Sequence, residues 1–325
     1  MHVERSKEYG PGTVLTFLTL VALMIIAGCG GNDAGSKWKE VENDVSLPLC
    51  GVWAASLGEA WVIACDGQGA MGIILEWDGN IFDRDFFETD HIFRDIAGAG
   101  DSVWVFGNTP IYQLYHKCLS YHLGANGDWQ GFECGDEAMH GVGVGLSGNA
   151  AGVGNSGNVW SWNTSFWEME PGAVEGEPSL KSVWYGGSGE VWVAGSNGSI
   201  ARKDGPGWEI SETPTEESLY CIWGRGPDDI WAVGSEGTVL KYDGSVWTTE
   251  DTGFGQTDFH GVWGVPEGDL WVVGEAGTVL HRDLSGVWTR EAGITTTSDL
   301  LDVRGSSAAD IWVVGDGGII LHHES

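Results

Sequence analysis

One sequence outline returns along this chain at a nearly constant interval, and it constrains the fold more than any other feature. The segment DIWAVGSEGTVLKYDGSVWTTE (229–250) reappears forty residues later as DLWVVGEAGTVLHRDLSGVWTRE (269–291). The glycines that close the W-x-V-G run recur every 39 to 41 residues, at Gly195, Gly234, Gly274 and Gly315. A period of this length indicates a fold built from repeated structural units.

The repeat extends toward the N-terminus in three less regular units. Gly154 continues the interval, with Ala151 in place of the tryptophan. Gly107 follows Trp104 in a longer unit, and Trp61 begins the first one. The chain therefore contains seven units.

Each unit is predicted to form four short strands, which we name a to d in chain order. In the sixth unit these are residues 259–264, 269–274, 277–282 and 286–291. Alternating polarity and β-branched or aromatic residues mark the strands, and Gly, Pro, Asp and Ser separate them. The b–c connections GSNG, GSEG, GEAG and GDGG suit tight hairpins whose residues adopt positive φ.

Seven four-stranded antiparallel units of about 40 residues are typical of a β-propeller, so we predict an all-β, seven-bladed propeller. The seventh unit stops at Ser325 without a strand d, whereas SKWKEVE (36–42) has the outline of SVWTTED (245–251). The N-terminal segment is therefore predicted to supply the outer strand of the last blade and to close the ring.

The N-terminus has the pattern of an export signal. Arg5 and Lys7 precede an apolar run at 14–27, whose 14 residues are too few to span a bilayer as a helix. The run ends in Ile26-Ala27-Gly28-Cys29, which resembles a bacterial lipoprotein signal with its lipobox.

This resemblance implies a signal peptide at 1–28, and a lipidated Cys29 that begins a flexible tether at 29–35. A single propeller domain then covers 36–325. Gly30, where an inner-membrane retention signal has Asp, favours the outer membrane, on its periplasmic or cell-surface side. The alternative is an uncleaved N-terminal anchor helix.

The charge balance argues against nucleic acid as a partner. The chain has 47 acidic and 15 basic residues, for a formal charge of −32. Phosphate binding needs clustered Lys and Arg, whereas this composition fits cations, basic surfaces or solubility.

The repeat outline VWG, D-x-W-x-V-G, G-T-V-L, D-G-x-x-W resembles the repeats of BNR/Asp-box propellers and of photosystem II assembly-factor-like propellers. The segment 243–247 (DGSVW) stands at the c–d turn, where those families carry their Asp-box, and is one residue tighter. The resemblance covers nearly the whole mature chain and implies the fold. Such propellers host unrelated functions.

Most tryptophans occupy repeat positions, which favours packing between blades over a ligand platform. Those in strand a are Trp53, Trp184, Trp223 and Trp263. The acids before strand b are predicted to stabilise turns through hydrogen bonds to the backbone. They are Glu190, Asp229, Asp269 and Asp310.

Four cysteines are placed to form two disulfides. Cys50 and Cys65 are equidistant from the centre of a predicted a–b turn, and Cys118 and Cys134 flank a c–d turn in the same way. An exported location permits both bonds. Cys221 remains, and a buried, inert thiol is the favoured interpretation.

The histidines form no metal motif, because adjacent residues such as His322 and His323 point to opposite faces of a strand. We expect no metal and no cofactor.

The irregular connections between units point to one rim of the propeller. The d–a and b–c loops emerge there, and the long d–a loops are predicted at 83–92, 168–179, 209–218 and 250–258. Departures from a repeat are where function is expected. The candidate binding residues on this rim are Phe86, Phe87, Tyr112, Tyr115 and Phe254.

These features favour a non-enzymatic binding or assembly scaffold, a monomer tethered to the membrane that presents its rim to a protein or a glycan. The alternative is a sialidase-like glycoside hydrolase, since that family shares the Asp-box propeller; it would need a cluster of arginines. Arg94 and Arg304 are the candidates for this cluster. A third hypothesis, suggested by the charge alone, is a calcium-stabilised adhesin.

Overall fold

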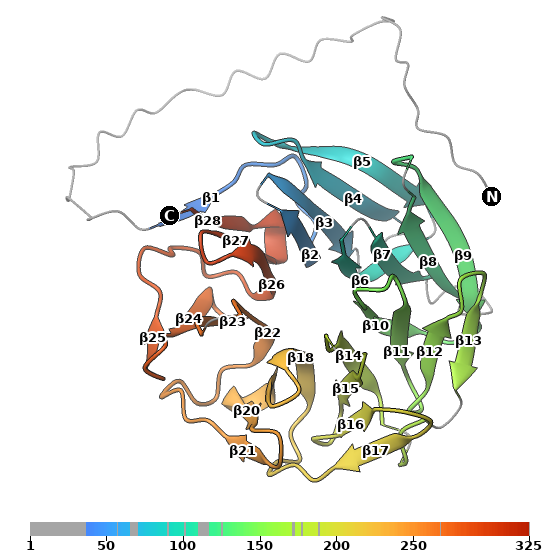
Figure 1. Cartoon of the computed structure of the whole chain (residues 1–325). Helices are drawn as coiled ribbons and strands as arrows, with labels where there is room; N and C mark the ends of the chain where they lie inside the picture. Colours follow the sequence, from blue (N-terminus) through green and yellow to red (C-terminus); the bar gives the residue numbers. More distant parts are fainter. Residues whose placement is uncertain are drawn as a thin grey trace, which may run out of the picture.

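The protein is a closed ring of seven four-stranded antiparallel sheets, as the repeat predicts (Figure 1). A computed structural model describes residues 37–56, 58–65, 71–89, 91–100, 102–109, 117–124, 126–170, 173–176, 178–187, 189–266 and 268–324. The predicted signal peptide and tether lie outside the described residues.

The first three blades follow the chain in the order a, b, c, d. Blade 1 contains β2 (Leu49–Ser56), β3 (Glu59–Cys65), β4 (Met71–Trp77) and β5 (Phe82–Thr89). Blade 2 contains β6 (Ile92–Ala99), β7 (Ser102–Asn108), β8 (Cys118–Leu123) and β9 (Trp129–Gly135). Blade 3 contains β10 (Met139–Val144), β11 (Ala150–Gly154), β12 (Val159–Trp162) and β13 (Trp167–Glu170).

The next three blades are more regular. Blade 4 contains β14 (Leu180–Tyr185), β15 (Val191–Gly195), β16 (Ile200–Lys203) and β17 (Trp208–Ser211). Blade 5 contains β18 (Leu219–Gly226), β19 (Asp229–Gly234), the 3₁₀ turn η1 (Ser235–Gly237), β20 (Val239–Tyr242) and β21 (Trp247–Thr249). Blade 6 contains β22 (Phe259–Gly264), β23 (Leu270–Gly274), β24 (Thr278–Arg282) and β25 (Trp288–Arg290), close to the predicted bounds.

Blade 7 combines the two ends of the chain. It contains β26 (Leu300–Ser307), β27 (Asp310–Gly315), the 3₁₀ turn η2 (Asp316–Gly318) and β28 (Ile320–Glu324), with β1 (Trp38–Glu40) as its outer strand. Trp38 pairs with His323 and Glu40 with Leu321, and the Val41 amide donates to the Ile320 carbonyl at 2.9 Å. The predicted closure is therefore confirmed.

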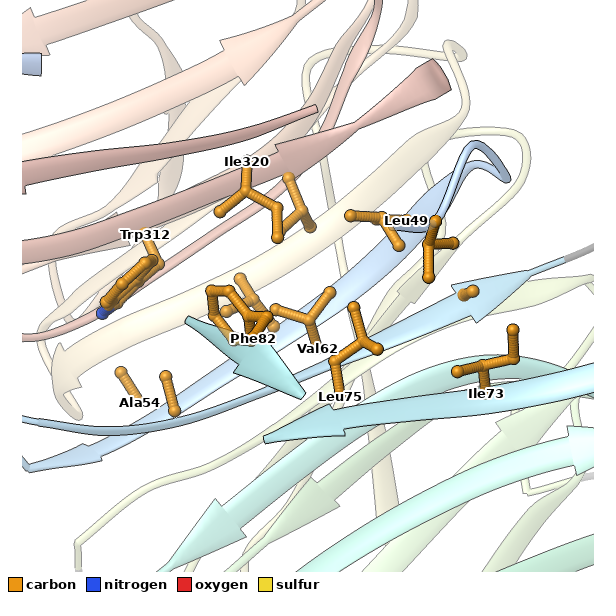
Figure 2. Packing of buried hydrophobic residues seen from close by; sticks show 13 residues of the cluster. Leu49, Ala54, Val62, Ile73, Leu75, Phe82, Trp312 and Ile320 are labelled. Carbon is orange, nitrogen blue, oxygen red and sulfur yellow. The ribbon is translucent and has the colours of Figure 1, made fainter. Parts of the chain in front are cut away.

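One apolar cluster fills each junction between neighbouring blades in the described part of the chain. At the junction of blades 7 and 1, Trp312 and Ile320 pack against Leu49, Val62 and Phe82 (Figure 2). Tryptophans of strand b lie in these clusters, and Trp231 and Trp312 are at most 1% exposed. The packing role predicted for the strand-b tryptophans is thus confirmed.

The tight b–c turns require glycine for steric reasons. Ala276 and Gly277 both adopt left-handed backbone conformations, with φ of 52° and 65°. A Cβ at Gly277 would overlap the carbonyl oxygen of Thr296 in the following d–a loop. The conformation and the close approach together explain why this turn position is glycine in blade after blade.

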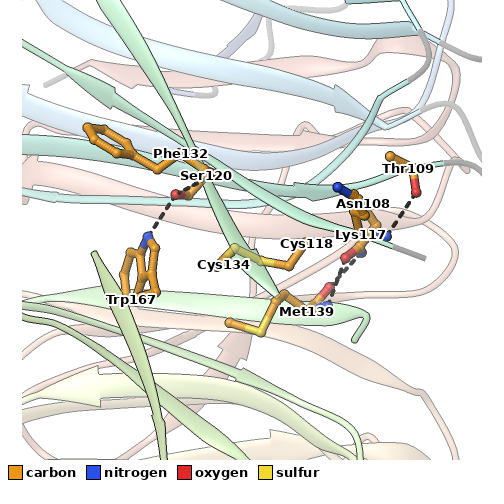
Figure 3. The surroundings of a disulfide bond; sticks show 9 residues. All are labelled: Asn108, Thr109, Lys117, Cys118, Ser120, Phe132, Cys134, Met139 and Trp167. Carbon is orange, nitrogen blue, oxygen red and sulfur yellow. Dashed lines mark hydrogen bonds between the residues drawn. A yellow bond between two sulfur atoms is a disulfide. The ribbon is translucent and has the colours of Figure 1, made fainter. Parts of the chain in front are cut away.

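Both predicted disulfides are present, within blade 1 and within blade 2. The Cα atoms of Cys50 and Cys65 are 5.8 Å apart, and those of Cys118 and Cys134 are 5.1 Å apart. Figure 3 shows the second bond, which joins β8 to β9.

Side-chain hydrogen bonds to the next blade lie close to this second disulfide. Trp167 Nε1 of β13 donates to Ser120 Oγ at 2.8 Å, and Asn108 exchanges two hydrogen bonds with the Met139 backbone (Figure 3). Blades 2 and 3 are therefore joined by polar as well as apolar contacts.

Two details of the predicted architecture are wrong. Residues 83–89 belong to β5 rather than to a d–a loop, because this outer strand is longer than those of the regular blades. Two of the acids before strand b bond side chains rather than the backbone: Asp229 accepts from Arg225 and Trp231, and Asp310 accepts from His322. Asp229 and Asp310 hold side chains of strands a, b and c in their own blades.

Removing the closing strand should destabilise the whole ring. We expect Trp38→Ala to lower the free energy of unfolding by about 3–5 kcal/mol, because Trp38 is 6% exposed and packs on His323 at a ring distance of 5.0 Å. Chemical denaturation measures the effect, and deletion of 36–45 should lower the melting temperature further.

Lys39→Ala is the matched control for Trp38→Ala. The Lys39 pair with Glu324 is exposed, so its loss should cost less than about 1 kcal/mol. Equal stability of the Trp38→Ala and Lys39→Ala variants would show that β1 does not hold the ring closed.

Candidate functional site

The inner strand of every blade starts with the same bulge. In blade 5, Leu219 pairs with Gly234 and Cys221 with Val233, so Tyr220 is left between them without a partner in the ladder. The same register shift occurs in β2, β6, β10, β14, β22 and β26. Three positions of strand a therefore recur around the axis. We name them the bulged position, the middle position directly after it, and the terminal position two residues after the middle one.

Short polar side chains at the middle position link neighbouring blades. The Val142 amide donates to Asp95 Oδ2 at 2.8 Å, and the Val52 amide donates to Asp302 Oδ2 at 3.1 Å. Ser182 Oγ accepts from the next blade in the same way. These bonds join inner strands of different sheets, which no ladder hydrogen bond does.

An arginine takes the terminal position in blade 7, where four other blades have tryptophan. Arg304 Nη1 lies 2.9 Å from Asp302 Oδ1 and donates to the Val303 carbonyl at 2.8 Å. Burial raises the pKa of Asp302, with the guanidinium opposing that shift, and the nearby carboxylates raise the pKa of Arg304. Arg304 therefore remains a cation, with 18% of its side chain exposed.

Asp95 is a fully buried acid whose pKa is raised into the neutral range. Burial and the negative charge of Asp302 raise its pKa to about 7, although the Val142 amide and Arg304 oppose the shift. Asp95 and Asp302 stand in blades 2 and 7, on either side of blade 1, whose middle position is Gly51.

A cavity of about 560 Å³ opens at the end of the ring where strands a finish. Its walls come from the inner-strand ends of all seven blades. Tryptophan occupies the terminal position in blades 1, 4, 5 and 6, Arg304 in blade 7, and Ala97 and Gly143 in blades 2 and 3. Because Ala97 and Gly143 are small, the cavity wall is thin on the side of blades 2 and 3. Leu146, which is 83% exposed, lies at the edge of the cavity.

The strand-a tryptophans pack against the clusters between blades, as predicted, and they also line this cavity. Trp53, Trp184 and Trp223 are only partly buried, and each presents part of its ring to the cavity. Trp53 also packs on Gly98 of the next blade, where a Cβ would overlap the indole. These side chains therefore pack against neighbouring blades and also line a cavity large enough for a ligand.

One of the predicted rim residues, Phe86, is wrongly assigned to the rim. Phe86 is 8% exposed and packs against Phe93, Tyr121 and Trp129, so it belongs to the core rather than to a binding rim. Phe87 lies in β5, paired with Ile73.

Of the other predicted rim residues, the structure describes the surroundings of Phe254. Phe254 lies in the predicted 250–258 loop but is partly buried against the cluster of blades 5 and 6. Tyr112, Tyr115 and Cys29 lie outside the described residues.

The two arginines proposed for a glycosidase site occupy different levels of the ring. Arg94 has the bulged position of β6, whereas Arg304 has the terminal position of β26. Arg84, Arg202, Arg225 and Arg282 each pair with an acid elsewhere. The arrangement gives no convergent arginine cluster in the described part of the chain.

Two further predictions concern the thiol of Cys221 and metal binding. Cys221 is buried, and burial raises the pKa of its thiol. No group of three or more His, Cys, Asp or Glu is placed to hold one metal ion among the described residues. No described helix is long and apolar enough to cross a bilayer.

Asp95 should make stability depend on pH. Folded Asp95 holds its proton up to about pH 7, whereas an ordinary Asp loses it near 3.8, so unfolding releases a proton between these values. The free energy of unfolding of the natural chain should therefore fall as the pH rises through this window, by at most about 1.4 kcal/mol per pH unit. Asp95→Asn cannot titrate, so its stability relative to the natural chain should increase from pH 5 to pH 7.

Denaturant titrations at pH 5, 6, 7 and 8 measure this difference. Asp136→Asn removes an exposed carboxyl and controls for the loss of one charge. A difference between Asp95→Asn and the natural chain that stays constant from pH 5 to pH 8 would contradict the raised pKa.

Comparison with known proteins supports the fold. No family model and no curated protein matches the chain. Among solved structures, YCF48 from Cyanidioschyzon merolae is 15% identical with a TM-score of 0.68, covering 88% of this chain and 98% of that one.

A structure described as YCF48 bound to D1 peptide has the same identity and TM-score, covering 90% and 98%. Virginiamycin B lyase from Staphylococcus aureus is 14% identical with a TM-score of 0.73, covering 88% and 98%. At these identities the similarity establishes that the chain is a β-propeller.

Proposed function

We propose that this protein is a membrane-tethered, non-enzymatic binding scaffold that receives part of a protein or glycan partner in the cavity where strands a end. The single observation that carries the proposal is the tryptophan-lined cavity to which all seven blades contribute. This location differs from the loop rim that the sequence favours.

The cavity has the size and lining of a recognition site. Its volume of about 560 Å³ lies in the usual range for ligand pockets, and its mouth is open to solvent. Indole rings give large, rigid contact surfaces to apolar side chains and to sugar rings, and tryptophan and arginine dominate binding energy in many interfaces. Trp53, Trp184, Trp223 and Arg304 offer both kinds of contact.

A peptide segment is the occupant that the observations favour. The YCF48 structure with a D1 peptide is a propeller of similar fold with a peptide bound. The thin wall at Ala97 and Gly143 leaves room for a chain to enter beside the tryptophans. The lyase has the same fold, so the fold itself does not distinguish binding from catalysis.

The tether extends this proposal to a location. Lipidation of Cys29 would attach the propeller to the outer membrane, on its periplasmic or cell-surface side. Because β1 begins at Trp38 in blade 7, the attachment would join the ring at its closing blade.

Photocrosslinking in intact cells tests the binding site. We expect p-benzoylphenylalanine in place of Leu146, at the cavity edge, to give an adduct of defined mass with the partner. The same residue in place of Leu284, which is 75% exposed and does not line the cavity, should give none. Trp184→Ala combined with Trp223→Ala should reduce the Leu146 adduct at least tenfold, because it removes two walls of the cavity.

Trp208→Ala is the matched variant for this experiment. Trp208 is a partly buried strand-d tryptophan outside the cavity, so its loss should lower stability but leave the adduct unchanged. Equal adducts from both crosslinker positions, or an adduct that survives the double substitution, would refute the cavity as the binding site.

Substitution of Cys29 tests the tether separately. We expect Cys29→Ser to abolish palmitate incorporation and to move the protein from the membrane fraction to the soluble fraction, since the thiol is the acylated group. Fractionation and metabolic labelling measure this. Cys221→Ser should leave labelling unchanged, and a labelled Cys29→Ser protein would overturn the assignment.

A further inference from the structure

Three basic side chains occupy the bulged position in consecutive blades. Arg94 of β6, His140 of β10 and Lys181 of β14 are each displaced from the ladder by the register shift at the start of strand a. The three inner strands pack side by side around the axis (Figure 1). The side chains therefore meet at the end of the ring opposite the tryptophan cavity. Along each strand, the bulged position precedes the terminal position by about three residues, or roughly 10 Å.

Arg94 and Lys181 are two of the five described Lys and Arg residues that form no ion pair with a described acid; the others, Lys37, Lys241 and Arg290, lie outside the cluster. In the described part of the chain, eight Lys and Arg side chains form ion pairs: Lys39, Arg84, Lys117, Arg202, Lys203, Arg225, Arg282 and Arg304. Arg94 and Lys181 form none with any described residue, and they interact electrostatically with each other and with His140. In a chain with 47 acids and 15 bases, these two bases and His140 stand at one structural position in three consecutive blades.

His140 adds a titratable donor between the two cations. Its Nε2 donates to Asn155 Oδ1 at 3.0 Å, and Ser179 Oγ donates to the same oxygen at 3.0 Å. Nδ1 is therefore the nitrogen left to take up a proton and become a second donor. The charged groups facing His140 are Arg94 on β6 and Lys181 on β14.

The repulsion is visible in the pKa values of Lys181 and His140. Burial, followed by the charge of Arg94, lowers the pKa of Lys181. Burial lowers the pKa of Arg94, and burial together with both cations lowers the pKa of His140, opposed by its bond to Asn155. An anion placed among them would remove the repulsion and favour the protonated forms.

We propose that Arg94, His140 and Lys181 form a binding site for an oxyanion, a carboxylate or a phosphate group, at the end of the channel where strands a begin. Arginine and lysine are the usual ligands of both anions. The site ends at blade 5, where the bulged Tyr220 is faced by the acids Asp258 and Glu217. The basic sector is thus confined to blades 2, 3 and 4.

Calorimetric titration of the full mature propeller with sodium phosphate and, separately, sodium acetate tests the proposal at constant ionic strength. We expect the natural chain to bind at least one of them, and Arg94→Gln with Lys181→Gln to weaken that binding at least tenfold. Lys241→Gln with Arg290→Gln removes the same charge at bases outside the cluster and should change the affinity less than twofold. Phosphate binding alone assigns a phosphate ligand, and acetate binding alone assigns a carboxylate.

Two further readouts separate a binding site from a structural feature. Without added anion, Arg94→Gln should raise the melting temperature because it removes repulsion. After correction for the titration of the anion itself, affinity should increase as the pH falls from 8 to 5.5, and His140→Gln should abolish this remaining dependence. Failure of the natural chain to bind either anion, or equal binding by the Arg94 and Lys181 double variant, would overturn the proposal.

Discussion

The pairing of β1 with β28 holds the ring closed, and the geometry at the axis depends on that pairing. Trp38 enters the apolar cluster of blades 6 and 7, so β1 contributes core packing as well as hydrogen bonds. At the other face of blade 7, Trp312 packs against blade 1. Only a closed ring brings seven inner strands to one axis, which is the condition for both the channel and its tryptophan cavity.

Convergence of seven strands leaves little volume at the middle position, and the residues there reflect it. A Cβ on Gly141 would meet the Lys181 carbonyl of the next blade, and Gly51 and Gly261 are similarly confined. Where a side chain is present it is short and bonds the next backbone, as Asp95, Ser182 and Asp302 do. Carboxylates therefore stand in a buried place, and the raised pKa of Asp95 follows from that placement.

The sequence predicts the blade number, the strand order, the closure and both disulfides, because each follows from a local period or spacing. The function of the strand-a tryptophans could not be predicted in the same way. Trp184 and Trp192 both stand at repeated positions, yet Trp192 is 1% exposed and Trp184 lines the cavity. Whether a repeated residue lies between two sheets or beside the axis depends on its distance from the axis. The period of the sequence does not specify this distance.

Phe86 shows a second limit of the repeat. The outer strands of regular blades end after three or four residues, so 83–92, with four acids among ten residues, has the composition of a loop. In blade 1 the outer strand continues through a bulge opposite Ile74 and Leu75, and this bulge turns Phe86 into the core. The local sequence does not reveal the bulge, since it depends on pairing with β4.

Departures from the repeat still indicate where function lies, but the informative ones are single positions rather than long loops. Core positions of strand b are apolar in every blade because neighbouring sheets must pack. The bulged position carries no such constraint, and its residues are Cys50, Arg94, His140, Lys181, Tyr220, His260 and Leu301. Because packing does not select these side chains, three consecutive bases at this position in an acidic protein need another cause, and an anionic ligand supplies one.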